Sequence, residues 1–242
     1  MNCLILAAGY GSRLRRLGPS KPLAEVAGIP LVEHVVRSAA AGGASRFTIV
    51  TGHCADRVEA FLADLSTRLG LPIAPVRIGD WDRPNGYSVV AGADRIEGDY
   101  LLSMSDHLFD PDIVRRLIAA PRTDGVRLAI DRNLANSFVD LDDVTRVETG
   151  PGGEIVRIGK ALEVHDAFDT GLFLATGLLR AAILEAVESG KSGSLSDGVQ
   201  RLAEQGRAST LEIEGAWWAD VDDEPAHASV EAWLSRDLRR QG

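Results

Sequence analysis

At 242 residues, with 45% hydrophobic and 25% charged residues, the chain has the composition of a globular protein and not of a disordered or fibrous one. Its net charge of −9 has the wrong sign for a protein that grips nucleic acid non-specifically, and no apolar run reaches the ~18 residues of a membrane span. The N-terminus lacks the basic leader of a signal peptide, and Cys3 and Cys54 alone make neither a disulfide framework nor a zinc site. We therefore expect a cytoplasmic enzyme or binding protein without nucleic-acid or membrane partners.

In the first half of the chain, short apolar runs alternate with helical patterns. The predicted strands are residues 3–7, 46–51, 72–78 and 99–104. The predicted helices are residues 30–41, 55–68, 86–95 and 111–119. Strands separated by helices of this length pair in parallel through right-handed crossovers, so this half predicts a Rossmann-like sheet.

The second half is more mixed, because several strand-like segments follow one another without long helices between them. The predicted strands are residues 126–131, 144–148, 155–158, 168–175 and 209–213. The predicted helices are residues 177–189, 195–204 and 225–239. No linker or repeat divides the chain, so we predict one α/β domain, 1–242, with a mixed, mainly parallel sheet flanked by helices. Residues 121–242 would complete the sheet begun by 1–120 and supply a second ligand surface.

A turn with two glycines follows the first predicted strand. Gly9 and Gly11 let the backbone pass close to a phosphate chain and present N–H groups to it. Arg13 adds a forked cation and Lys21 a compact charge, and both suit the oxygens of a triphosphate. Lysine is rare here, with three among the 26 cations, which favours a specific use for Lys21. A tight strand-to-helix turn would explain the glycines alone, but the cations favour phosphate binding by residues 1–120.

Two other phosphate motifs do not fit this chain. A dinucleotide fingerprint would need a third glycine at the position of Leu14, so NAD binding is not predicted. Residues 190–192 read Gly-Lys-Ser like the end of a P-loop, but Glu185 stands where its first glycine is required. We expect residues 190–192 to form a polar connection between two helices.

Residues 6–28 resemble the signature of the nucleotidyltransferase superfamily that makes NDP-sugars and CDP-alcohols, through L-A-A-G-x-G-x-R-L at 6–14 and K-P-L at 21–23. Later segments follow the order seen in CTP:inositol-1-phosphate cytidylyltransferases and relatives acting on phosphocholine or phosphonates: 85–88, 105–107, 140–147, 158–160, 169–171 and 220–222. The resemblance covers nearly the whole chain. It implies a Rossmann-like fold and Mg²⁺-dependent transfer of a nucleotidyl group from an NTP to a phosphate monoester, with release of pyrophosphate.

By this resemblance Arg13 and Lys21 are the catalytic residues. The nucleotide would be contacted by Leu6, Ala7, Ala8, Gly9, Gly11, Ser12, Arg13, Lys21, Asn85, Gly86, Ser88 and Asp106. Asn85 and Gly86 would read the pyrimidine edge with help from Ser88, although an ordinary asparagine helix cap explains Asn85 as well. For the acceptor, Lys160 would bind the phosphate and Asp169 the hydroxyl groups, with Asp131 a weaker candidate. Solvated surface positions are the alternative for all three.

Three aspartates are predicted to hold Mg²⁺. Asp106 follows the fourth strand at its carboxyl end, where open α/β sheets bind ligands such as Mg²⁺. The alternative for Asp106 is to cap the next helix, but Asp110 is also a candidate for that cap. Strand alternation would put Asp220 and Asp222 on one face, and a cation between them would relieve their repulsion. The related families usually read D-V-D-T-P here, and this chain departs from that pattern after Asp222. We favour Asp222 as the ligand, with helix capping by Asp222 or Asp223 as the alternative.

The reaction expected is attack by a phosphate oxygen of the acceptor, such as inositol 1-phosphate, on the α-phosphorus of CTP. His107 receives no catalytic role, and residues 140–143 are interpreted as a solvated acidic turn. A sugar-1-phosphate, phosphocholine or phosphonate nucleotidyltransferase is an alternative within the same class. A glycosyltransferase using an NDP-sugar at Asp220 and Asp222, and a non-catalytic nucleotide-sensing module, are alternatives of other classes. The preference for CTP over UTP or GTP stays open at this stage.

Overall fold

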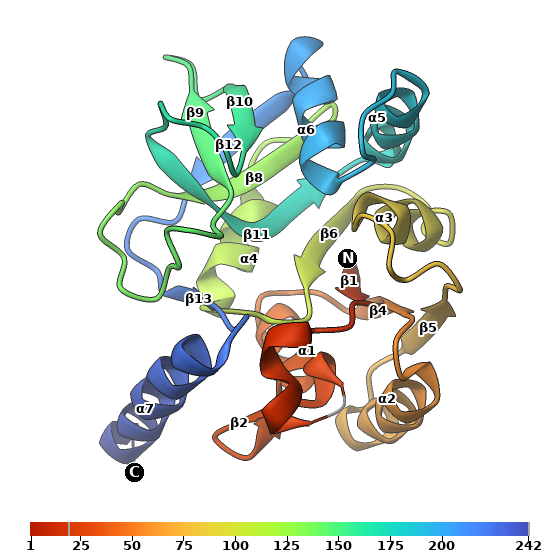
Figure 1. The fold of residues 1–242 in the computed structure, drawn as a ribbon, viewed down its shortest axis with the longest axis vertical. Helices are drawn as coiled ribbons and strands as arrows, with labels where there is room; N and C mark the ends of the chain where they lie inside the picture. The colour runs from red at the N-terminus through yellow and green to blue at the C-terminus, as the bar shows by residue number, and fades with distance from the viewer. Residues whose placement is uncertain (19, 242) are drawn as a thin grey trace.

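The computed structural model describes residues 1–18 and 20–241, and within these ranges a nine-stranded mixed sheet forms the centre of the molecule (Figure 1). Its first half runs β6-β1-β4-β5, with all three pairs of strands parallel. These strands are β1 (Asn2–Ala7), β4 (Arg46–Thr51), β5 (Ile73–Arg77) and β6 (Tyr100–Met104). The parallel sheet predicted for the first half is confirmed.

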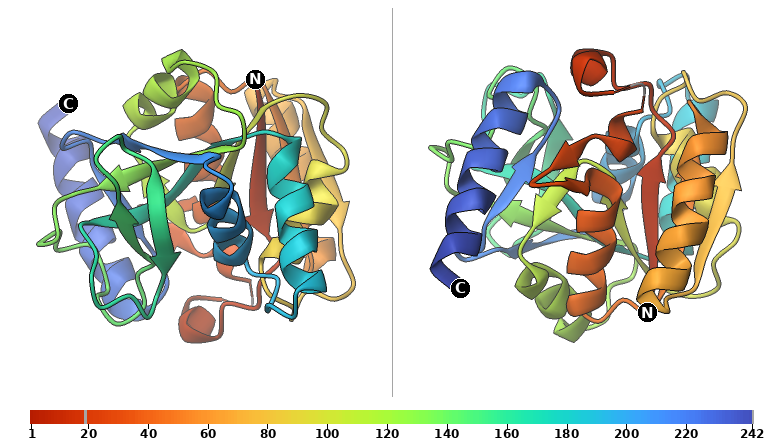
Figure 2. Two further views of the ribbon diagram at one scale, coloured as in Figure 1. Left: turned by 90° about the horizontal axis from the view of Figure 1, so that it is seen from above. Right: turned by 90° about the horizontal axis from the view of Figure 1, so that it is seen from below.

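Helices cover both faces of this half, as the views in Figure 2 show. The helices are α1 (Leu31–Ala41), α2 (Ala55–Leu69), α3 (Gly86–Ala93) and α4 (Pro111–Ala119). Alternation along β1 explains the two layers: Cys3 and Ile5 point into one buried cluster with α1, α2 and α4, whereas Leu4 and Leu6 point into the other with α3. A parallel sheet needs such cover on both faces.

The second half extends the same sheet with strands of mixed direction. They are β8 (Val126–Asp131), β9 (Arg146–Thr149), β10 (Ile155–Gly159), β11 (Ala167–Ala175) and β12 (Ala208–Glu212). The long strand β11 joins the halves, because it pairs antiparallel with both β6 and β8. Two further helices, α5 (Gly177–Glu188) and α6 (Leu195–Glu204), pack on the same face as α3. The predicted mixed sheet flanked by helices is confirmed.

Several short elements escaped prediction. They are the 3-10 helices η1 (Ser12–Leu17) and η2 (Lys21–Leu23), the hairpin strands β2 (Glu25–Val26) and β3 (Ile29–Pro30), and the paired strands β7 (His107–Phe109) and β13 (Trp218–Asp220). The last helix, α7 (Glu224–Gln241), lies beside the β2–β3 hairpin (Figure 2), where Ala27 N donates to Glu231 Oε2 at 2.6 Å. Across the described residues, helices long and apolar enough for a bilayer crossing are absent.

Candidate active site

A cleft of about 320 Å³ opens where the strands of the first half end, and both halves of the chain line it. The predicted residues on its walls are Leu6, Ala8, Gly9, Lys21, Asn85, Ser88, Asp106, Lys160, Asp169, Asp220 and Asp222. The predicted residues outside its walls are Ala7, Gly11, Ser12, Arg13, Gly86 and Asp131. The sheet thus brings together side chains more than 200 residues apart in sequence, such as Lys21 and Asp222.

The glycine turn positions Lys21. Gly11 has a φ of +61°, and a Cβ placed on it would lie 2.3 Å from the Cβ of Lys21. A side chain at this position would therefore push Lys21 away from the cleft. Gly9 instead faces open space, with no described atom within 4 Å of the position of a Cβ. The backbone at Gly9 is accessible to a ligand, and the backbone at Gly11 supports the lysine.

Lys21 lies between two carboxylates. Its Nζ contacts both Asp106 and Asp222, and only 10% of the lysine side chain is exposed. Burial alone lowers the pKa of Lys21, but Asp106, Asp222 and Asp220 outweigh it and hold the pKa above its usual range. Burial likewise raises the pKa of Asp106, but Lys21 and His107 hold it well below the usual range. The lysine is cationic and Asp106 anionic at any working pH.

The pairing of β7 with β13 builds a group of possible metal ligands. It places His107 opposite Asp220, and ligand atoms of Asp106, His107 and Asp220 all lie within 4.8 Å of one another. His107 Nδ1 is 3.0 Å from Asp106 Oδ1 and 3.7 Å from Asp220 Oδ1. Burial suppresses ionisation of the imidazole, but Asp220 and Asp106 outweigh it and raise the pKa of His107 to about 9.

Asp220 fits a divalent cation. Its Oδ1 is buried without a hydrogen-bond partner among the described residues, and burial raises the pKa of this carboxyl to about 7. An orphaned carboxylate oxygen beside Asp106 is the hard donor that Mg²⁺ prefers. Asp222 lies beyond the end of β13 and is held by Lys21 and Arg13. The geometry therefore favours Asp220 over Asp222 as the partner of Asp106, the reverse of the sequence-based preference.

The capping alternatives are resolved at the helices themselves. Asp110 caps α4 by accepting a hydrogen bond from Asp112 N at 2.8 Å, which leaves Asp106 for the cleft. Asp223 accepts a hydrogen bond from Ala226 N at 2.8 Å at the start of α7, which leaves Asp222 for the cleft. The two aspartates predicted to face a ligand are therefore not needed as helix caps.

Asn85 and Gly86 connect the nucleotide side of the cleft to α6. Asn85 makes no side-chain cap to α3, and its Oδ1 instead accepts a hydrogen bond from Leu195 N at 2.8 Å. A Cβ on Gly86 would lie 2.2 Å from Gly193 O, so a glycine is required for this close packing. Ser88 lies one helical turn along from Asn85 and also lines the cleft. Asn85 and Ser88 remain candidates for nucleobase contact, whereas Gly86 serves packing.

On the acceptor side the structure separates the three candidates. Lys160 lines the cleft with its side chain 59% exposed, and Asp169 lines it from β11. Asp169 accepts a hydrogen bond from Gly171 N at 2.7 Å, and burial raises its pKa to about 6. Asp131 lies outside the cleft, and its carboxylate accepts from Asn136 Nδ2 at 2.9 Å and Trp218 Nε1 at 2.8 Å. Asp131 therefore fixes the indole of the cleft wall, and its place outside the cleft argues against the predicted role in binding the acceptor.

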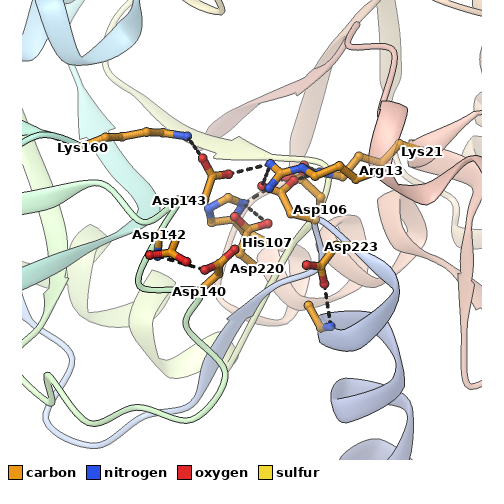
Figure 3. A network of polar contacts seen from close by, with 12 residues as sticks. Arg13, Lys21, Asp106, His107, Asp140, Asp142, Asp143, Lys160, Asp220 and Asp223 are labelled. Atoms are coloured by element: carbon orange, nitrogen blue, oxygen red, sulfur yellow. Dashed lines mark hydrogen bonds and ion pairs between the residues drawn. The ribbon is translucent and has the colours of Figure 1, made fainter.

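Sequence reasoning gave no role to several polar residues that line the cleft, among them His107 and Asp143. His107 belongs to the ligand group through a strand pair that joins residues 107 and 220, and no local pattern signals such a pairing. Asp143 lies in the acidic segment that was interpreted as a solvated turn. The segment is a turn, with Asp142 N donating to Asp140 Oδ1 at 2.9 Å, but Asp140 and Asp143 face the cleft (Figure 3).

Comparison with known proteins places the chain in a family. Residues 3–137 match the model of the MobA-like NTP transferase domain. The chain belongs to this family. It is 37% identical to the "Bifunctional IPC transferase and DIPP synthase" of Rubrobacter xylanophilus, over 90% of this chain and 48% of that protein. The protein of the same name from Thermococcus kodakarensis is 28% identical, over 90% of this chain and 47% of its own length.

A protein named GlmU from Ralstonia nicotianae is also similar, with 27% identity over 100% of this chain and 53% of its own. The chain thus spans about half the length of the curated relatives it matches. Among solved structures, the inositol-1-phosphate CTP transferase from T. maritima has a TM-score of 0.86 at 22% identity, with 97% of this chain and 94% of the other covered. This likeness confirms the predicted nucleotidyltransferase fold.

Proposed function

We propose that this chain joins a phosphate monoester, inositol 1-phosphate or a similar phospho-alcohol, to CTP and releases pyrophosphate. The observation that carries the proposal is Lys21, buried between Asp106 and Asp222 in the cleft where the parallel strands end. The acceptor class is supported by the relatives named IPC transferase, which match 90% of this chain. The chain would perform the nucleotidyltransferase part of such proteins.

The charges in the cleft suit this reaction. An oxygen of the acceptor phosphate attacks the α-phosphorus of CTP, a new P–O bond forms, and the bond to the bridging oxygen of the β-phosphate breaks. Lys21 and Arg13 would hold the triphosphate and stabilise the charge that develops on the departing pyrophosphate. Lys160 would orient the acceptor phosphate, and Asp169 would accept hydrogen bonds from its hydroxyl groups.

A divalent cation completes the proposed chemistry. Asp106 and Asp220 would hold Mg²⁺, with His107 beside them, and the bound ion would neutralise phosphate charge between donor and acceptor. The orphaned oxygen of Asp220 supports this assignment. Without a cation, the three aspartates at 106, 220 and 222 would repel an incoming triphosphate despite Lys21.

The test is pyrophosphate release, measured for four NTPs against inositol 1-phosphate, phosphocholine, glucose 1-phosphate and glycerol phosphate, with Mg²⁺ and after EDTA. We expect release with CTP and inositol 1-phosphate, loss with EDTA and recovery with added Mg²⁺. The Lys21→Ala variant should lose about 10²–10³-fold in turnover, as expected for removal of one preorganised group. Release that needs neither metal nor Lys21 would refute the mechanism.

A sugar-1-phosphate nucleotidyltransferase is the second candidate, favoured by the likeness in fold to a "Putative Glucose-1-Phosphate Thymidylyltransferase" from Bacillus anthracis, with a TM-score of 0.82 at 19% identity. Such an enzyme would use the same residues to bind the NTP. The contacts made by Lys160 and Asp169, which face the acceptor, would be to a sugar phosphate. The same matrix of substrates separates the two, because glucose 1-phosphate in place of inositol 1-phosphate would then give the fastest release. A nucleotide sensor would release no pyrophosphate with any pair of substrates.

A further inference from the structure

Ion pairs run across the cleft from one half of the chain to the other. Asp143 Oδ2 accepts from Arg13 Nη2 at 2.6 Å, and its Oδ1 accepts from Lys160 Nζ at 2.5 Å. One carboxylate therefore uses each of its oxygens on a different cation, one from residues 1–120 and one from residues 121–242. Figure 3 shows Asp143 lying between the two, on the wall of the cleft.

The carboxylate is the fixed member of this trio. Its turn is held by bonds from Asp143 N and Val144 N to Asp140 O, at 3.2 and 2.9 Å, and by Arg146 Nη2, which donates to Leu141 O at 2.8 Å. The Asp143 side chain is 25% exposed, compared with 48% for Arg13 and 59% for Lys160. The long cationic side chains thus reach to an anion whose position the backbone sets.

Asp143 differs in one respect from the other carboxylates of the cleft. Among the described residues it alone pairs with both Arg13 and Lys160, and it lies outside the group of Asp106, His107 and Asp220 whose ligand atoms could share a cation. A divalent ion bound to that group would not neutralise Asp143, whose charge is balanced by Arg13 and Lys160. The two cations that neutralise Asp143 are the same ones that the proposed function assigns to substrate phosphates.

We propose that Asp143 occupies, in the free protein, a phosphate site shared by Arg13 and Lys160, and that a phosphate dianion entering the cleft draws both cations away from its carboxylate. The inference rests on the proposed function for the identity of the substrate. A phosphate offers the same paired oxygens as a carboxylate with a larger charge, so it competes for the same donors. The site spans both halves, so binding at it couples the donor side of the cleft to the acceptor side.

The test is isothermal titration calorimetry with separate ligands, so that no transfer occurs: inorganic phosphate, inositol 1-phosphate, CTP and, as a phosphate-free control, inositol. The Asp143→Asn variant removes the charge that competes for Lys160 and one of the two that compete for Arg13, Asp222 being the other, so we expect it to bind phosphate ligands about three- to tenfold more tightly than the wild type. Asp142→Asn is the matched control. It removes the same charge from the neighbouring residue, which is exposed and lies outside the cleft wall.

Tightening limited to inositol 1-phosphate and inorganic phosphate would assign the site to the acceptor, and tightening limited to CTP would assign it to the triphosphate. In either case the Arg13→Gln substitution, added to Asp143→Asn, should abolish the gain. Affinity that is unchanged, matches that of Asp142→Asn, or rises equally for inositol would overturn the proposal. Weaker binding would also overturn it, because Asp143 would then position the cations for substrate. Failure of nucleotidyl transfer would show in the pyrophosphate assay and not in these binding measurements.

Discussion

Replacing Gly11 with alanine tests whether the glycine turn exists to position Lys21. The new methyl group would lie 2.3 Å from the Cβ of Lys21, more than about 1 Å inside ordinary van der Waals contact. The Cβ of Lys21 is fixed to the backbone, so relief requires a shift of the lysine itself. A displacement of this size costs about 10²-fold in rate when it affects a catalytic group. The left-handed φ of +61° adds a strain of about 1–2 kcal/mol to the alanine variant.

Gly28 provides the matched control. Its φ is +74°, and no described atom lies within 4 Å of the position of a Cβ, so Gly28→Ala bears the same backbone strain without touching Lys21. Backbone strain should cost both variants about 1–2 kcal/mol of unfolding free energy in urea, and Gly11→Ala should lose more because of its overlap with Lys21. Only Gly11→Ala should lose about 10²-fold in kcat/KM, measured by pyrophosphate release. Equal activities in the two variants would show that the turn does not position the lysine.

Three further predictions follow from the site and the core. Lys160→Ala should raise the KM for the acceptor at least several-fold with little change in the KM for CTP, because Lys160 is assigned to the acceptor phosphate; an unchanged acceptor KM would remove it from the site. Mn²⁺ binding, followed by electron paramagnetic resonance, should weaken more in Asp220→Asn than in Asp222→Asn, because the oxygen of Asp220 is the unpartnered one. Glu33, buried beside two arginines whose hydrogen bonds lower its pKa to about 2, stabilises the fold above pH ~4.5 by about 1–3 kcal/mol. That stability disappears as the pH falls toward 2, and urea titrations of Glu33→Gln should show a flatter dependence on pH in this window.

The larger elements were predictable because their signals are local. The pattern of apolar residues places the strands of the parallel half within one or two residues of their observed bounds, since each is a short run closed by a turn. The helix predicted to begin at Pro30 begins one residue later, where Pro30 itself is the N-cap. The strand β7 and the pairing of β13 were missed for the opposite reason, and the strand alternation expected for Asp220 and Asp222 fails because β13 ends at Asp220. Each has three residues, and their pairing depends on a partner more than 100 residues away.

The site residues also divide into those with a local signal in the sequence and those placed by contacts between distant segments. Lys21 and Asp106 stand in motifs beside strong elements, so their place on the cleft wall follows from the sequence. Asp131 also ends a strand, but its carboxylate turns to Trp218, a contact that joins two segments distant in sequence. Asp143 lies in a polar turn whose composition is indistinguishable from that of a solvated loop. Which face of such a turn meets the cleft depends on the packing of residues 121–242 against the first half.

The distribution of lysine ties these observations together. Of the three lysines in the chain, Lys21 and Lys160 line the cleft, whereas many of the described arginines join ion pairs at the surface. A compact ammonium can exchange one oxygen partner for another with little rearrangement, whereas a guanidinium is fixed by its planar fork. Lys21 contacts Asp106 and Asp222, and Lys160 contacts Asp143. Each of these two lysines is therefore already neutralised by carboxylates in an acidic protein, and we propose that substrate binding exchanges a carboxylate partner of the lysine for a phosphate.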